Sequence, residues 1–111
     1  MTKDSSIFAR EMLQLIENTK SFVGLQSREE FLNDHKTAAS VLLEIIMLGE
    51  MAKRAPEDLK AAVDIPWRDI AGFRDRAIHQ HSKIDMEIVA GIVFDRLKSV
   101  EHAIRAYLPR V

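Results

Sequence analysis

The chain has 111 residues, of which 47% are hydrophobic and 30% are charged, with a formal net charge of −1 and no cysteine. This composition indicates a single soluble globular domain over residues 1–111, and it excludes disulfides, thiolate metal sites, a cysteine nucleophile and nucleic-acid binding over the whole surface. No apolar stretch approaches the roughly 20 residues that span a bilayer, and the N-terminus is charged where a signal peptide is apolar, so we expect a cytoplasmic protein without membrane contact.

The N-terminal half of the chain predicts two long helices with a short one between them. Apolar residues recur at helical spacing over residues 5–23, and Gly24 is expected to end that helix. Ser27 and Glu30 have the spacing of a capping box, which predicts a short helix behind them. Residues 37–55 are apolar over most of the helix surface, which indicates a central bundle helix or one that is buried in a subunit interface.

Three residues interrupt the apolar surface of the helix predicted over residues 37–55. Gly49 costs about 1 kcal/mol relative to alanine in a helix interior, so we expect another helix to approach closely there. Glu44 and Glu50 allow two interpretations. Either both carboxylates reach the solvated edge of the helix, or one of them pairs with a cation in a cleft.

The C-terminal half predicts further helices and no strand of convincing length. Pro56 is expected at the junction between the central helix and a short one, and Pro66 suits the first turn of a helix that continues to Ile78. The last helix is predicted over residues 85–108, with Asp85 as its N-cap. The chain as a whole therefore predicts an all-α, antiparallel up-and-down bundle of four main helices with short extra helices.

Cations gather near the end of the helix that follows Pro66. The segment holds Arg68, Arg74, Arg76, Lys83, Asp69, Asp75, His79 and His81, a local charge of +2 before any histidine is protonated. One interpretation is a solvated face with two exposed histidines, and another buries His79 with a hydrogen bond to a backbone carbonyl. The third is a site for an anion, because arginine offers a planar fork to phosphate oxygens and histidine exchanges protons near neutral pH.

Arginine and histidine together suffice for RNA cleavage without a metal. A base removes the 2′-OH proton, an acid protonates the leaving 5′-oxygen, and a fixed cation stabilises the charged phosphorane. Arg74 and His79 are separated by about 140° on an ideal helix, so they converge only if the helix ends near Ile78 or a second subunit contributes. The competing interpretation is a metal site, but His79 and His81 lack a third ligand at a suitable spacing, so we expect no metal and no cofactor.

The segment IPWRDIAGFRDRAIHQHSKID, which contains Arg74-x4-His79, resembles the R-x4-6-H signature of HEPN domains. With REEFLND, LGEMAKR and IDMEIV in the same order and spacing, nearly the whole chain resembles the HepT-like toxins of type VII-like HEPN–MNT toxin–antitoxin systems. The resemblance implies a homodimeric helical bundle that cleaves RNA by 2′-OH attack, independently of metal, in a cleft where two motifs face each other. It assigns phosphate or transition-state stabilisation to Arg74 and general acid/base work to His79. The implied partner is an MNT-type nucleotidyltransferase antitoxin.

Two residues depart from the family pattern. Asp75 replaces the asparagine that usually follows the motif arginine; an ionised carboxylate repels phosphate, so we expect Asp75 to orient His79 or to pair with Arg76. His81 replaces the tyrosine that the antitoxin modifies with AMP, and Tyr107 is not an obvious substitute for it. We expect His81 to be an accessory acid/base group and Arg76 an RNA contact. The alternative is a catalytically inactive module that binds nucleotide, RNA or the nucleotidyltransferase.

Overall fold

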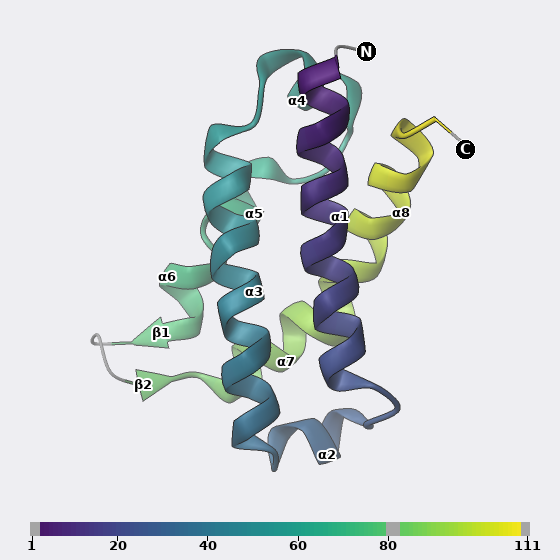
Figure 1. Cartoon of the computed structure of the whole chain (residues 1–111). Helices are drawn as coiled ribbons and strands as arrows, with labels where there is room; N and C mark the ends of the chain where they lie inside the picture. Colours follow the sequence, from purple (N-terminus) through teal and green to yellow (C-terminus); the bar gives the residue numbers. More distant parts are fainter. Residues whose placement is uncertain (1–2, 80–82, 110–111) are drawn as a thin grey trace.

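The structure, a computed structural model, describes residues 3–79 and 83–109, and helices dominate this part of the chain (Figure 1). The predicted all-α class is confirmed. The elements in chain order are α1 (Lys3–Val23), α2 (Arg28–Leu32), α3 (His35–Arg54), α4 (Glu57–Ala62), α5 (Trp67–Ala71), α6 (Phe73–Ala77), β1 (Ile78–His79), β2 (Lys83–Ile84), α7 (Met86–Gly91), the π-helical turn η1 (Ile92–Arg96) and α8 (Leu97–Tyr107).

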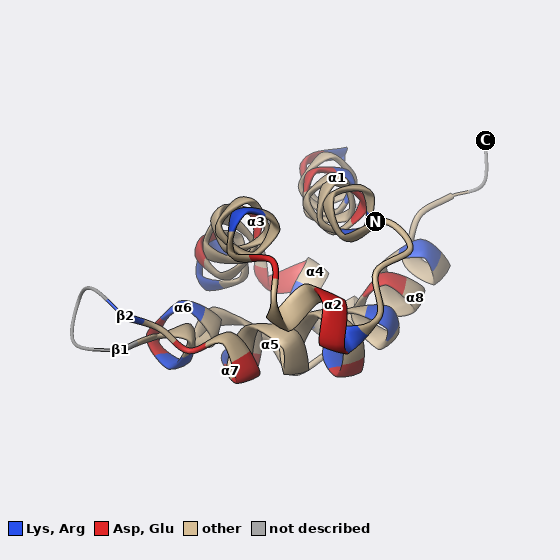
Figure 2. Ribbon diagram, turned by 90° about the horizontal axis from the view of Figure 1, so that it is seen from below, with Lys and Arg blue, Asp and Glu red and all other residues tan. Residues whose placement is uncertain are grey.

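The helices form two layers. Helices α1 and α3 run antiparallel and lie side by side, while α5, α6, α7 and α8 form the second layer beneath them (Figure 2). Helix α3 packs on α5 and α6, and α1 packs on α8. The chain therefore passes up and down the bundle, with the broken pair α5–α6 as one of its four members and α2 and α4 as short extra helices (Figure 1).

Several predicted helix ends are confirmed. Gly24 follows α1 with a φ of 59°, a left-handed conformation that suits glycine. Ser27 and Glu30 form both hydrogen bonds of a capping box at the start of α2. Asp85 caps α7 by accepting a hydrogen bond from the Ile88 N–H at 3.1 Å.

The start of α3 differs from the sequence prediction. The helix begins at His35 instead of residue 37, because the Asp34 side chain is its N-cap and accepts from the Thr37 N–H at 3.1 Å. Asp34 also accepts from the Thr37 hydroxyl at 2.6 Å and from Gln26 Nε2 at 2.8 Å. These hydrogen bonds, that of the Thr37 side chain foremost, favour the carboxylate and lower the pKa of Asp34 to about 2.

The helix predicted from Pro66 to Ile78 is broken at Gly72 into α5 and α6. Gly72 ends α5 by donating its N–H to carbonyls at Arg68 and Asp69, and it is also the N-cap of α6. The last predicted helix is also irregular, since η1 interrupts it between α7 and α8. There the Leu97 N–H donates to the Ile92 carbonyl five residues back.

The close approach expected at Gly49 is confirmed. A Cβ on Gly49 of α3 would lie 3.1 Å from the backbone oxygen of Ile70 in α5. The core between the two layers is apolar, and its largest fully buried side chains include Phe31, Phe73, Met12, Ile16, Ile45, Leu48, Leu59, Ile70 and Ile104. Within the described residues, no helix combines the length and the apolar character needed to cross a membrane.

Candidate functional site

The Arg74-x4-His79 motif lies across the end of a helix. Helix α6 stops at Ala77, and Ile78 is extended, with φ −116° and ψ 117°. The chain continues as β1, which pairs antiparallel with β2 so that His79 stands opposite Lys83. One of the two conditions that would let Arg74 and His79 converge, a helix end near Ile78, is therefore met.

A backbone hydrogen bond between the residue before β1 and the residue after β2 holds the two short strands together at the end of α6. The Asp85 N–H donates to the Ala77 carbonyl at 2.8 Å, which closes the two-strand unit directly after α6. For His79 the structure describes the backbone and not the side chain, and His81 lies outside the described residues. The roles predicted for these two side chains therefore remain predictions.

Arg74 presents its guanidinium to solvent from α6. Its side chain is 48% exposed, and its Nη1 lies 3.3 Å from Oδ1 of Asp75, whose side chain is 74% exposed. A solvent-exposed ion pair contributes little free energy, about 0–1 kcal/mol, so an incoming phosphate can compete for the guanidinium. Asp75 was expected to orient His79 or to pair with Arg76, and the structure places it against Arg74.

Arg76 turns to a different partner, which the sequence analysis did not anticipate. Its Nη2 lies 2.8 Å from Oδ1 of Asp69 and donates to the Asp69 backbone oxygen at 2.9 Å. Its guanidinium carbon lies 5.5 Å from the ring centroid of Phe73. A second arginine, Arg96 of η1, forms an ion pair with the other carboxylate oxygen of Asp69.

Asp69 and Arg96 are structural residues of this region that sequence reasoning missed. A weak signal existed for Asp69, because it lies seven residues before Arg76 and so falls on the same side of a helix. No comparable signal existed for Arg96, which is more than 25 residues away and reaches Asp69 only through the fold. In Figure 2, basic and acidic segments of α6 lie beside the short strands at the edge of the molecule.

The two glutamates of α3 have partners outside residues 68–83. Glu50 pairs with Lys53 on its own helix at 3.3 Å, and both side chains are about half exposed. This agrees with the solvated-edge interpretation for Glu50. Glu44 is half-buried and accepts from Asn18 Nδ2 of α1 at 3.4 Å. Neither contact places a carboxylate against Arg74 or Arg76.

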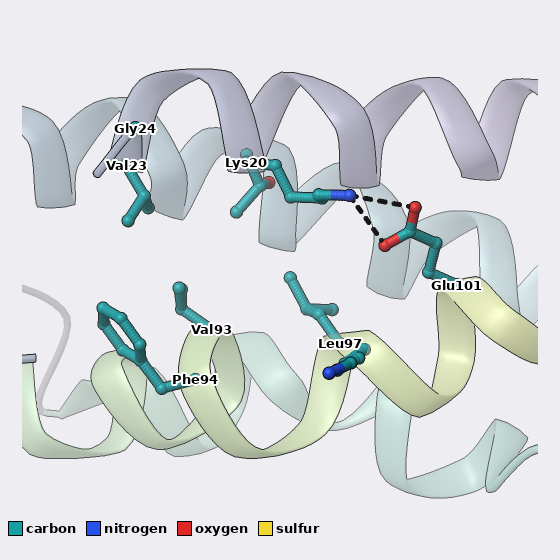
Figure 3. A pocket seen from close by; sticks show the side chains of 9 residues that line it. Lys20, Val23, Gly24, Val93, Phe94, Leu97 and Glu101 are labelled. Atoms are coloured by element: carbon teal, nitrogen blue, oxygen red, sulfur yellow. Dashed lines mark hydrogen bonds and ion pairs between the residues drawn. The ribbon is translucent and has the colours of Figure 1, made fainter. Parts of the chain in front are cut away.

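A cavity of about 360 Å³ opens between the end of α1 and the η1–α8 stretch (Figure 3). Val23, Val93 and Leu97 give it an apolar lining, and the Lys20–Glu101 ion pair, 3.1 Å long, crosses its rim. Burial opposes ionisation of Glu101, but hydrogen bonds from Arg105 and Lys20 outweigh it and lower its pKa. This cavity contains no residue of the motif segment and is separate from the candidate site.

Two further features bear on the chemistry. Among the side chains that the structure describes, which do not include those of His79 and His81, no group of three or more histidines and carboxylates is arranged to hold a metal ion. The hydroxyl of Tyr107, the only tyrosine of the chain, is buried and has no hydrogen-bond partner in this part of the chain. The tyrosine hydroxyl is therefore not presented to solvent.

Comparison with known proteins places the chain in a family. A family model described as "Ribonuclease HepT-like" matches residues 12–107. A protein of Methanocaldococcus jannaschii named "Putative RNase" is 31% identical over 93% of this chain and 89% of its own length. A "Probable ribonuclease HepT" of Thermococcus cleftensis is 28% identical over 91% of this chain and 93% of its own length. No solved structure matches the chain. Because the family model spans most of the chain, from the middle of α1 to the end of α8, this protein belongs to the HepT-like ribonuclease family.

Proposed function

We propose that the protein is the toxin of a type VII-like HEPN–MNT toxin–antitoxin system and cleaves RNA without a metal. The observation that carries the proposal is the placement of the motif. Arg74 stands half-exposed on α6, and the helix ends before His79. The family membership and the names of the relatives support ribonuclease activity.

In the proposed reaction, Arg74 holds the scissile phosphate and stabilises the charge that develops on its oxygens. A histidine removes the 2′-OH proton, the 2′-oxygen attacks phosphorus, and the bond from phosphorus to the 5′-oxygen breaks. A protonated histidine returns a proton to the leaving oxygen. The products are a 2′,3′-cyclic phosphate and a free 5′-OH. His79 performs this proton transfer, with His81 as an accessory group.

Two copies of the chain supply the second histidine. Leu43 and Met47 lie one turn apart on α3 and are 58% and 45% exposed. Such paired apolar side chains on a long helix provide a contact surface for a second copy. In the dimer, one His79 serves as base while the other serves as acid, and two Arg74 side chains face the RNA.

The proposed partner is an MNT-type nucleotidyltransferase antitoxin. In this chain His81 occupies the position of the family tyrosine, and the hydroxyl of Tyr107 is buried. Neutralisation therefore proceeds by binding of the partner and not by modification of a tyrosine of this chain.

The second candidate function is a binding module without turnover. The observation that favours it is the Asp75 carboxylate, which lies 3.3 Å from the Arg74 guanidinium and would repel a phosphate there. In this case nucleotide or RNA binds to the Arg74 region, which calorimetry would detect, and the RNA remains intact.

Arg74 is the residue to test first. Arg74→Ala should abolish cleavage of labelled RNA, and Arg74→Lys should restore part of it, because lysine keeps the charge but loses the fork. Arg10→Ala, which removes an exposed arginine of α1, is the matched control and should cleave like wild type. Equal cleavage by Arg74→Ala and wild type would contradict the proposal.

A further inference from the structure

The carboxylate of Asp69 links three segments, α5, α6 and η1, around α6, the helix that carries Arg74 (the motif helix). Asp69 of α5 places Oδ1 2.8 Å from Nη2 of Arg76 in α6, and its Oδ2 pairs with Nη2 of Arg96 in η1. The Asp69 side chain is 24% exposed, whereas both arginines are nearly half exposed. The carboxylate thus lies between two guanidinium groups that would otherwise repel each other.

Arg76 makes a hydrogen bond and a ring contact in addition to its ion pair with Asp69. The same Nη2 donates to the Asp69 backbone oxygen at 2.9 Å, and the guanidinium lies over the ring of the buried Phe73. A Cβ on Gly72 would lie 3.6 Å from Nη1 of Arg76, so the side chain folds back across the break between α5 and α6. These contacts fix the angle between α5 and α6 at Gly72.

Helix α6 needs such support from outside. It has five residues, and no side chain caps its N-terminus. A helix this short is not stable by itself in water, so its orientation depends on tertiary contacts. Phe73 and Ala77 provide the apolar contacts on the buried face, and Arg76, three residues after Phe73, adds a polar contact with Asp69 beside them.

The other two segments that Asp69 joins are α5 and η1. Helix α5 is pressed against α3, where the Ile70 backbone oxygen meets Gly49. Arg96 lies at the end of the π-helical turn, and such turns change the direction of the side chains that follow, since each residue turns the helix by about 100°. Asp69 therefore connects α6 both to α5, which is packed against the central helix, and to η1.

We infer that Asp69 is a positioning residue: through Arg76 and Arg96 it orients α6 so that Arg74 is aimed at the RNA phosphate. This inference rests on the proposed function. Asp69 does not touch substrate, and its effect is on the geometry of Arg74. Loss of its charge lowers turnover more than it weakens substrate binding, because a misaligned guanidinium still attracts the RNA but stabilises the transition state less well.

The test compares two carboxylates, each of which forms ion pairs with two cationic side chains. Asp69→Asn removes the charge between Arg76 and Arg96, and Glu101→Gln does the same between Lys20 and Arg105, neither of which contacts α6 through an ion pair in the described part of the chain. Asp69→Asn should lower kcat about tenfold or more and change KM less than about twofold. Asp69→Glu should recover part of kcat, and Glu101→Gln should leave kcat at the wild-type value.

Amide hydrogen exchange separates this inference from the proposed function, because it needs no turnover. In Asp69→Asn and in Arg96→Met, the amides of Phe73–Ala77 should exchange faster while those of α1 stay unchanged. If wild type does not cleave RNA, the proposed function fails, and unchanged exchange in α6 would still refute the role of Asp69. With an active wild type, an unchanged kcat in Asp69→Asn, or an equal loss in Glu101→Gln, would overturn the inference.

Discussion

Gly49 of α3 lies against the backbone oxygen of Ile70 in α5, where a Cβ on the glycine would be 3.1 Å from that oxygen. The contact sets how closely α5 approaches the central helix. Because α5 leads directly into α6, the same contact determines how far the motif helix stands from the core. The oxygen belongs to the backbone of a fully buried residue, so it cannot move aside as a flexible side chain could.

Gly49→Ala should therefore destabilise the protein despite the better helix propensity of alanine. We expect a net loss of about 1 kcal/mol, since the strain of about 1–3 kcal/mol exceeds the propensity gain. Gly91→Ala is the control: its Cβ would meet side-chain ends of Arg28 and Asp95 at 3.9 Å, an ordinary contact. Gly91→Ala should stabilise the protein by about 0.5–1 kcal/mol. Urea denaturation measures the free energy of unfolding of both variants. A Gly49→Ala variant that is more stable than wild type would show that the approach of α5 to Gly49 is not close.

Asp34 should make folding depend on pH in the acid range. Its pKa is lowered from 3.8 to about 2 by hydrogen bonds from the Thr37 side chain and backbone and from Gln26. A lowered pKa stabilises the fold above 3.8, and this contribution is lost as the pH falls to about 2. Asp34→Asn keeps an N-cap but does not titrate. The difference in melting temperature between wild type and Asp34→Asn should therefore shrink over that interval, and parallel curves would count against the assignment.

The exposed pair on α3 should control association. If Leu43 and Met47 form the contact between two copies, wild type should have twice the chain mass of 12.7 kDa by light scattering. The double variant Leu43→Glu, Met47→Glu should be monomeric and lose RNA cleavage, because each site needs both copies. Ile7→Glu places the same charge on an exposed apolar residue of α1 and should remain dimeric. A monomeric wild type that still cleaves RNA would refute the proposed dimer.

Asp75→Asn should raise the catalytic efficiency of RNA cleavage. Asp75 pairs with Arg74 at 3.3 Å and presents a negative charge where the proposed function requires a phosphate. Removing that charge should raise kcat/KM for RNA by about two- to fivefold, the range expected for a partly screened surface charge. The gain should diminish as salt is added. A large loss of activity in Asp75→Asn would instead assign Asp75 a direct role, such as orienting His79.

Much of the fold could be predicted because the signals were local. The stop at Gly24, the capping box at Ser27 and the cap at Asp85 each depend on neighbouring residues. The close approach at Gly49 could be expected because a glycine is costly inside an apolar helix. These features need no knowledge of which elements meet across the core.

The parts that could not be predicted depend on tertiary contacts. The break at Gly72 depends on packing of α5 and α6 against α3, since an isolated glycine is tolerated in many helices. The π-helical turn adds a residue to one turn, so the buried Ile92 and Leu97 are five residues apart, and a single five-residue spacing is too weak a signal to predict it. At the site, Arg74 was identified from its motif, whereas Asp69 was missed because its partner Arg96 lies far away in the sequence.

The proposed function depends on metal-independent cleavage of RNA by Arg74 and His79. The most direct measurement incubates end-labelled RNA with wild type, His79→Ala and His102→Ala in excess EDTA and analyses the product ends. His102 is an exposed histidine of α8, and its variant is the matched control. We expect 2′,3′-cyclic phosphate ends with wild type and His102→Ala, and a loss of cleavage activity of roughly 100-fold or more with His79→Ala. Intact RNA with wild type, or equal cleavage by His79→Ala, would contradict the proposed function.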